Sequence, residues 1–463
     1  MRGRSLLIVA CAVAALQFSM SRNSDAQEAQ KLPPKSDRLI VVAPKQFHAA
    51  LGPFVDVKKL MRPTELAELE QILATTDGAD SPEKLKRWLF REWSERGLGY
   101  VLLVGDVSVL PVRYMVLDRV TPAAFDYSFY PSDLYYADLT KPDGSFEDWN
   151  AVKDDFHASY FGEVRGEKNK TEPINFDQVD YLPEIAVGRW PVETAEEVAL
   201  VAQKTTLFEF RVNAGTAVKR AGLIAVDGWV DTRQLMDTFK EKLEAKWAVD
   251  RHYYSGAQIP TKTPPSPEAT RGLFDRGCSL IVHAGHGQPD AWEQCFSVAD
   301  LDRITNIGHW PVVVSAGCST AYFAPLAPYG PYVDVNGVEH IGTDAGEQFT
   351  SPPPAPSPLQ TGKFNPTGLG EQILKRNEHG AVAYIGCNTG SQPCGLTLVD
   401  GFVRSLSQGP KQHLGDSWND AIRYYHRKEK LSELKPDDGW YPPSIFFQGM
   451  KFMLFGDPSL TLP

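Results

Sequence analysis

Residues 279–287 read Ser-Leu-Ile-Val-His-Ala-Gly-His-Gly, an apolar run that ends in a histidine, His286, between two glycines. Residues 311–320 read Pro-Val-Val-Val-Ser-Ala-Gly-Cys-Ser-Thr and repeat the arrangement around a cysteine, Cys318. Apolar runs without alternating polar residues are typical of parallel strands that are covered by helices on both faces. Both runs therefore predict buried strands, each with a reactive side chain where the strand ends.

The same strand pattern recurs along the chain, with helix signals between the strands. Predicted strands are residues 39–42, 100–104, 185–187, 222–226, 280–283, 311–315 and 381–385. Helix starts, marked by a capping Ser or Thr with Pro or Glu shortly after it, are predicted at Ser81-Pro82, Thr194–Glu197 and Ser266-Pro267. This alternation predicts an α/β fold in two units, residues 38–192 and 193–463, with mostly parallel sheets flanked by helices.

Two segments interrupt the alternation. Residues 126–171 are rich in Tyr, Asp, Gly and Asn, and we expect a long ordered loop there rather than core. Residues 322–366 contain a proline-rich run at 351–358, which excludes helix and central strand and predicts a partly extended surface insertion. Because the insertion begins four residues after Cys318, we expect it to lie beside any site built there.

The N-terminus has the pattern of a secretory signal peptide. Arg2 and Arg4 precede an apolar run at residues 6–16, and small residues follow at 24–26, which predicts a signal peptide over residues 1–26. Cys11 is an alternative lipoprotein site, but the apolar run continues past it. Residues 27–37 are polar and predicted to be disordered, and no later run approaches the ~20 apolar residues of a spanning helix. We expect a secreted or periplasmic protein without a transmembrane segment.

Composition limits the partners. The chain has 42% hydrophobic and 23% charged residues, which is ordinary for a globular protein, and a formal charge of −11. That charge argues against nucleic acid as a partner, because polyanions require a basic surface. Outside the predicted signal peptide the cysteines are Cys278, Cys295, Cys318, Cys387 and Cys394. An odd number leaves at least one thiol without a partner in the chain, while up to two disulfides remain open.

The reactive residues are expected to meet at one edge of the sheet. Open α/β sheets bind ligands outside the carboxyl ends of their strands, so neighbouring parallel strands would place Cys318 and His286 in one crevice. A nearby protonated histidine lowers the pKa of a cysteine, which favours a nucleophilic thiolate. Asp227, at the end of a third strand, is a candidate to orient the imidazole. Gly287 leaves room for a backbone N–H at a developing oxyanion. The alternative is that the cysteine and the histidine are ordinary structural residues.

These segments resemble the gingipain family of cysteine peptidases, in the group with caspase-like folds. The resemblance depends on Ala284-Gly-His-Gly287 with Ala291-Trp292, and on Ser315-Ala-Gly-Cys318. Supporting blocks, in the family's order, are residues 100–106 (Tyr-Val-Leu-Leu-Val-Gly-Asp), 132–136 (Ser-Asp-Leu-Tyr-Tyr), 184–189 (Glu-Ile-Ala-Val-Gly-Arg) and 455–459 (Phe-Gly-Asp-Pro-Ser).

The resemblance implies two Rossmann-like, caspase-like subdomains, of which the second holds the active site. It implies hydrolysis of peptide bonds in protein or peptide substrates through a thioester, with Cys318 as nucleophile and His286 as the acid that protonates the leaving amine. The backbone amides of Gly287 and Cys318 would form the oxyanion hole, and Asp227 falls where the family has an acidic residue near the histidine.

Specificity is the weaker part of the resemblance. Asp231 lies near the position of the acid at the base of the pocket in arginine-cleaving members, so cleavage after Arg or Lys is one expectation. An Asp at a helix start is also a common cap. The insertion after Cys318 is long, and residues around Asn388 lack the tryptophan of well-known members.

A calcium site is a further hypothesis, as a structural ion only, because the expected chemistry needs no cofactor. Asp148, Asn150, Asp154 and Glu163 bring oxygen ligands together in the predicted loop, and calcium takes about six to eight oxygens. A solvated acidic loop is the alternative. A transition-metal hydrolase is disfavoured, because His283 and His286 have no third ligand nearby.

Two other functions remain open at this stage. A transpeptidase would use the same dyad, and an inactive exported binding protein could keep the same fold. The intact His286, Gly287 and Cys318 favour an enzyme, while the sequence leaves hydrolysis, transfer and the oligomeric state open.

Overall fold

The computed structural model describes residues 36–117, 128–147, 149, 179–255, 263–342, 354–361, 367–408, 412–435 and 441–463. The predicted signal peptide and the predicted calcium ligands Asp148, Asn150, Asp154 and Glu163 lie outside the described residues. Within the described part of the chain, no helix is long and apolar enough to cross a membrane.

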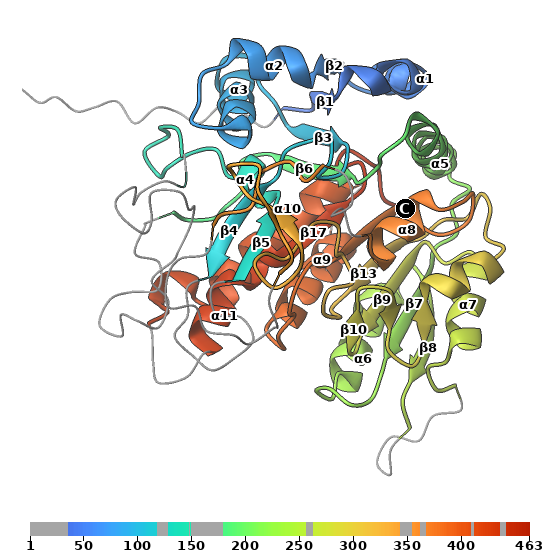
Figure 1. The fold of residues 1–463 in the computed structure, drawn as a ribbon. Helices are drawn as coiled ribbons and strands as arrows, with labels where there is room; N and C mark the ends of the chain where they lie inside the picture. Colours follow the sequence, from blue (N-terminus) through green and yellow to red (C-terminus); the bar gives the residue numbers. More distant parts are fainter. Residues whose placement is uncertain are drawn as a thin grey trace, which may run out of the picture.

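A ten-stranded sheet forms the centre of the molecule (Figure 1). In sheet order its strands are β2 (Thr64–Glu68), β1 (Leu39–Ala43), β3 (Tyr100–Val104), β6 (Ala186–Trp190), β17 (Phe452–Phe455), β16 (Ala383–Cys387), β13 (Val312–Ser315), β9 (Leu280–Ala284), β7 (Arg220–Ala225) and β8 (Ala248–Tyr253). All neighbours are parallel except β16 and β17. The sheet is therefore mostly parallel, and its two halves run in opposite directions on either side of that one antiparallel pair.

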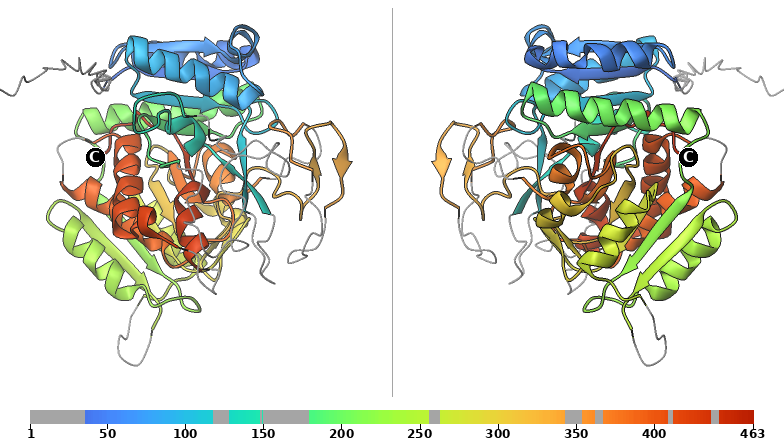
Figure 2. Two further views of the ribbon diagram at one scale, coloured as in Figure 1. Left: turned by 90° about the vertical axis from the view of Figure 1, so that its left-hand side faces the viewer. Right: turned by 90° about the vertical axis from the view of Figure 1, so that its right-hand side faces the viewer.

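Helices cover both faces of the sheet, which confirms the predicted α/β fold (Figure 2). One face is covered by α1 (His48–Lys59), α5 (Ala195–Asn213), α7 (Pro267–Asp275) and α8 (Leu369–Lys375). The other is covered by α2 (Leu69–Thr75), α3 (Ser81–Arg96), α4 (Leu134–Ala137), α6 (Arg233–Leu243), α9 (Gly395–Gln408), α10 (Leu414–Lys428) and α11 (Tyr441–Gln448). Successive strand residues enter opposite cores, because side chains alternate across a strand. In β1, for example, Val41 packs in the core beneath α1, and Ile40 packs in the core on the opposite face, beneath α3.

Most of the predicted boundaries hold, with one correction at a helix start. Thr194 accepts a hydrogen bond from Glu197 N at the start of α5, and Ser266 does so from Ala269 N at the start of α7. For α3, however, the cap is Asp80 rather than Ser81, since the Asp80 carboxylate accepts the Glu83 N–H. Ser81 is thus the first residue of the helix.

The expectation that residues 126–171 form a loop outside the core is wrong for their described part. Strand β5 (Ser128–Ser132) pairs antiparallel with β4 (Arg113–Leu117), and α4 follows directly. Tyr135, Tyr136 and Trp149 are fully buried. The described tyrosines of this segment and Trp149 therefore belong to the core.

The insertion after Cys318 contains a small hairpin, β14 (Tyr332–Val333) with β15 (Glu339–His340), which projects from the body of the molecule (Figure 2). Part of the proline-rich run returns to the body, where Pro358 O accepts a hydrogen bond from Val112 N at 3.1 Å. A separate three-stranded sheet, β10 (Gly287–Gln288), β11 (Ala291–Trp292) and β12 (Phe296–Ser297), follows the strand that leads to His286.

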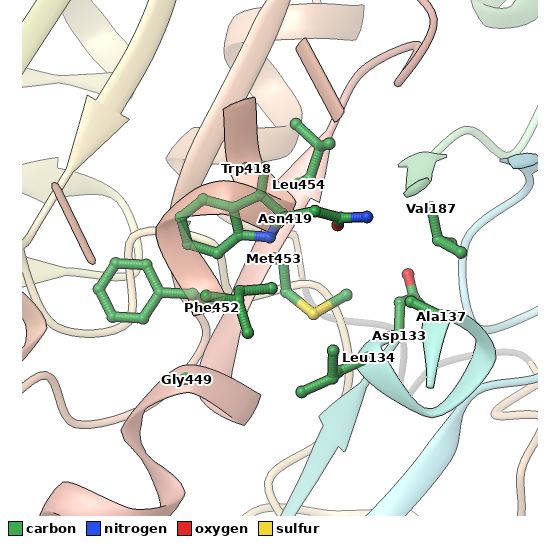
Figure 3. A pocket seen from close by; sticks show the side chains of 11 residues that line it. Asp133, Leu134, Ala137, Val187, Trp418, Asn419, Gly449, Phe452, Met453 and Leu454 are labelled. Carbon is green, nitrogen blue, oxygen red and sulfur yellow. The ribbon is translucent and has the colours of Figure 1, made fainter. Parts of the chain in front are cut away.

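The two halves of the sheet are joined by a buried ion network and by packing. Lys58 Nζ of α1 lies 2.6 Å from Glu209 of α5 and 2.7 Å from Asp457, just after β17. A small cavity at this junction is lined by residues such as Val187 from one half and Trp418 from the other (Figure 3). Its lining contains neither Cys318 nor His286, so this cavity is not the candidate catalytic site.

Candidate active site

Strands β9 and β13 place His286 and Cys318 at the same edge of the sheet. The two strands are parallel neighbours, and the last pair in register is Ser315 with His283. Cys318 follows Ser315 by three residues, and His286 follows His283 by three. Since adjacent strands lie about 4.8 Å apart, the cysteine loop (residues 316–322) and the histidine loop (residues 285–290) leave the sheet side by side.

The loops approach each other so closely that glycine is required between them. A Cβ on Gly287 would lie 2.6 Å from Cys318 O and 2.5 Å from Thr320 Cγ2. A Cβ on Gly317 would lie 3.1 Å from Gly287 Cα. Real Cβ atoms rarely come this close to a backbone, so larger residues would push the loops apart. Close packing of the two loops therefore explains why glycine lies next to each of the two candidate residues.

The imidazole of His286 forms a hydrogen bond with the loop that follows β7. His286 Nε2 lies 2.7 Å from the carbonyl oxygen of Gly228, just beyond β7. A carbonyl only accepts, so Nε2 carries the hydrogen and, in the neutral ring, Nδ1 is the acceptor. The partly exposed ring thus has a defined tautomer, in which Nδ1 can accept a hydrogen bond.

The thiol of Cys318 contacts the loop that follows β16. Ser391 N donates to Sγ at 3.3 Å, and Ser391 O lies 3.5 Å from Sγ. Burial raises the pKa of the Cys318 thiol, while the Ser391 N–H and the positive charge of Lys451 act to lower it. Ser319, the next residue, has a left-handed φ of 56°, a conformation that is uncommon outside glycine and often found at functional sites.

Cys318 is also the most accessible thiol among the described cysteines. Cys278, Cys295, Cys387 and Cys394 are buried, Cys318 is intermediate, and none of the five is in a disulfide. Burial raises the pKa of Cys278, Cys295 and Cys387 to about 12. These three thiols are thus protonated and enclosed at neutral pH, and Cys394 is also buried, which leaves Cys318 as the reactive candidate.

Asp227 is linked to the imidazole indirectly, through the backbone of Gly228. The exposed Asp227 carboxylate accepts a hydrogen bond from Gly228 N at 2.8 Å, and Gly228 O is the group that holds His286. The described partner of the imidazole is therefore a backbone carbonyl, with Asp227 on the other side of the same residue. Sequence reasoning missed this carbonyl, because a main-chain acceptor leaves no residue-type signal.

Asp231 already has a cationic partner. Arg233 Nε lies 2.9 Å from Asp231 Oδ1, and Arg233 Nη2 lies 2.8 Å from Oδ2. These bonds hold the pKa of Asp231 far below its ordinary value. The Arg233 guanidinium also stacks 4.0 Å from the centre of the Tyr254 ring. Asp231 is thus one member of an Asp–Arg–Tyr cluster and is 49% exposed.

His283 differs from His286 in its burial and in its hydrogen-bond partner. It is fully buried, its ring stacks on Trp292 with centroids 4.6 Å apart, and its Nδ1 lies 3.0 Å from Ser315 Oγ. Burial lowers the pKa of His283 to about 3, so it stays neutral. It supports the sheet beneath the loops, and the described residues contain no group of three or more side chains suited to a metal.

Comparison with known proteins decides the family. The sequence model of Peptidase family C25 matches residues 32–463. The chain belongs to Peptidase family C25. It is a cysteine-type peptidase, as the resemblance to gingipains predicts. No curated protein matches the sequence significantly.

Solved structures show the same fold as this C25 peptidase. One is the Arg-specific cysteine proteinase gingipain R, with 18% identity, 92% of this chain and 78% of that chain covered, and a TM-score of 0.58. Another is the complex of RgpB pro- and mature domains from Porphyromonas gingivalis, with 18% identity, 92% and 79% covered, and a TM-score of 0.57. These likenesses confirm the caspase-like gingipain fold.

Proposed function

We propose that the protein is an exported cysteine endopeptidase in which Cys318 and His286 form the catalytic dyad. The observation that carries the proposal is the register of β9 and β13, which brings the partly exposed thiol and the anchored imidazole to one sheet edge. Proteins and peptides are the substrates. Export depends on the predicted signal peptide over residues 1–26.

The proposed reaction follows from the tautomer of His286. Because Nε2 donates to Gly228 O, Nδ1 receives the proton of Cys318 Sγ as the thiolate attacks the scissile carbonyl carbon. The backbone N–H groups of Gly287 and Cys318 stabilise the oxyanion. The imidazolium then protonates the departing amine, which leaves a thioester on Cys318. Water, deprotonated by His286, hydrolyses the thioester and restores the thiol.

Asp227 acts in this proposal as a positioning residue. Its carboxylate holds Gly228 N, and Gly228 O orients the imidazole. The negative charge also favours the imidazolium that forms during the reaction. An asparagine at this position would keep the hydrogen bond and remove the charge, so the two contributions are separable.

We propose that the protein cleaves after Arg or Lys, provided that the substrate side chain can compete with Arg233 for Asp231. A substrate guanidinium could form two hydrogen bonds with Asp231, but Arg233 already makes both. A basic substrate must therefore displace Arg233 or share the carboxylate with it. Partial exposure of Asp231 leaves one side of the cluster open to such a competitor.

Hydrolysis of a peptide library by the purified mature protein tests the proposed reaction. Cys318→Ala should lower the rate by roughly 10⁴-fold or more, since members of a catalytic unit are strongly interdependent. The same assay with an added amine acceptor distinguishes hydrolysis from transfer. Undiminished hydrolysis in Cys318→Ala would overturn the dyad, and predominant transfer products would replace the hydrolase with a transpeptidase.

A further inference from the structure

The first turn of α8 contacts both catalytic loops through its backbone. Leu369 N donates to Pro289 O of the histidine loop at 2.7 Å. The next amide, Gly370 N, donates to Thr320 O of the cysteine loop at 2.8 Å. Two consecutive N–H groups of one helix thus join the two loops that carry His286 and Cys318.

Small residues make these contacts possible. A Cβ on Gly368 would lie 2.5 Å from Tyr322 O and 3.0 Å from Pro289 O. A Cβ on Gly370 would lie 2.8 Å from Thr320 O. It would also lie 2.8 Å from Cδ1 of the Tyr384 ring. The carbonyl oxygens cannot rotate away as the end of a side chain can.

The rest of α8 is fixed to the body of the protein. Lys204 Nζ of α5 donates to Leu374 O at 2.8 Å and to His379 O at 2.6 Å, beyond the end of the helix. Lys375 Nζ lies 3.3 Å from Glu193. Leu369 is fully buried in the core on this face. The helix therefore presents its first amides from a rigid support.

We propose that residues 368–370 are a positioning element, which sets the relative placement of His286 and Cys318 by tying their loops together. The proposal rests on the function proposed above. Proton transfer between Sγ and the imidazole requires donor and acceptor about 3 Å apart, and a misplacement of about 1 Å can lower a rate by roughly 10²-fold. Strand β16 also holds the cysteine loop, since Ala321 N donates to Cys387 O at 2.9 Å. Helix α8 adds contacts beyond both candidate residues and joins the two loops to one support.

Leu369 offers a matched pair of variants. Gly368 is the N-cap of α8, so Leu369 is its first helical residue, where proline is well tolerated. The extended conformation of Gly368, with φ −118° and ψ 178°, also suits a residue before proline. Leu369→Pro removes the N–H that binds Pro289 O, while Leu369→Ala keeps the N–H and removes only the buried side chain.

The test compares kcat, KM and melting temperature of the two variants with those of the active wild type. We expect Leu369→Pro to have a kcat about tenfold or more below that of Leu369→Ala. The KM values should agree within about twofold, because substrate binding does not depend on the hydrogen bond between Leu369 N and Pro289 O. Equal kcat values would overturn the proposal and leave the dyad untouched. An inactive wild type would instead overturn the proposed function.

A second variant covers the case in which Leu369→Pro does not fold. Gly370→Ala presses a Cβ against Thr320 O, so we expect a lower kcat and a changed pH dependence of Cys318 alkylation by iodoacetamide. A folded Gly370→Ala protein with wild-type kcat and alkylation profile contradicts the positioning role.

Discussion

The two halves of the sheet use the same sequence pattern for different purposes. Strand β3 is followed by Gly105-Asp106, much as β9 leads to Gly285-His286 and β13 to Gly317-Cys318. Asp106 is fully buried, and its carboxylate accepts hydrogen bonds from Ser108 N at 2.8 Å and Ser108 Oγ at 2.6 Å. His286 and Cys318, by contrast, are partly exposed. An apolar run followed by glycine and a polar residue therefore predicts where a strand ends. Whether the polar side chain can react depends on its exposure to solvent.

Strand direction separates the two sets of ends. Because β17 is parallel to β6 and antiparallel to β16, the carboxyl ends of β3 and β6 lie at the edge of the sheet opposite to those of β9 and β13. Asp106 thus cannot join the dyad, even though its sequence context resembles that of His286. The structural end and the reactive end can be tested separately.

The largest expected contrast is between His286→Ala and Asp106→Ala. We expect His286→Ala to lower kcat/KM by roughly 10³-fold or more with only a small change in the free energy of unfolding, because the ring is partly exposed and loses one hydrogen bond, to Gly228 O. Asp106→Ala should lower the free energy of unfolding by about 1–3 kcal/mol, since it leaves the Ser108 groups without their acceptor. Urea denaturation and steady-state kinetics on both variants check this, and a catalytic loss in folded Asp106→Ala would break the comparison.

The close approach of the loops gives the next effect. Gly287→Ala should lower kcat by about 10²-fold, because its Cβ would meet Cys318 O and separate the loops. Gly52→Ala in α1 is the control, since a Cβ there meets nothing within 4 Å. Activity and melting temperature are measured for both. Equal activity of the two variants would mean that the loops need not touch.

Specificity is expected to respond about tenfold. Asp231→Asn should reduce the preference for Arg or Lys before the scissile bond by about tenfold, while Arg233→Met should increase it, because it frees the carboxylate. Ratios of kcat/KM for matched Arg and Gln substrates measure the preference. Unchanged ratios in both variants would remove the Asp–Arg–Tyr cluster from the substrate pocket.

A smaller effect concerns the pH dependence of the thiol. Lys451 acts to lower the pKa of Cys318 against the effect of burial, so Lys451→Met should raise the pH at which iodoacetamide alkylates Cys318 at half its maximal rate. Below that pH the variant should react more slowly than the wild type, and Lys451→Arg should stay close to it. A midpoint that moves down or not at all in Lys451→Met would show that this charge does not act on the thiol.

The smallest expected effect tests calcium. If Asp148 and Asp154 ligate the ion, chelation should lower the melting temperature by about 2–4 °C. The double variant Asp148→Ala with Asp154→Ala should be insensitive to the chelator. An unchanged melting curve of the wild type with chelator would leave these residues as a solvated acidic segment.

Local signals in the sequence were sufficient for the strands and helices around the site. Strands β9 and β13 are continuous apolar runs, and the caps Thr194 and Ser266 start α5 and α7 as predicted. These features depend on neighbouring residues only. The placement of His286 and Cys318 near strand ends could be predicted for the same reason, since each lies within three residues of the end of its strand.

Features that depend on distant pairing were not predictable. The last strand, β17, enters between β16 and β6 and reverses the direction of the sheet, and no local pattern specifies that neighbour. The Gly228 carbonyl and the Ser391 amide contact His286 and Cys318 through the backbone, so their residue types give no signal in the sequence. The Arg233 partner of Asp231 is only two residues away, but its approach depends on how the loop folds.

Active-site labelling is the most direct test of the central claim that Cys318 is the nucleophile activated by His286. The mature protein is treated with a peptidyl acyloxymethyl ketone, which alkylates a catalytic thiolate, and peptide mapping by mass spectrometry locates the adduct. The account predicts a single adduct on Cys318, formed in step with loss of activity and greatly slowed in His286→Ala. Full activity with Cys318 labelled, or loss of activity with the adduct on another residue, would contradict it.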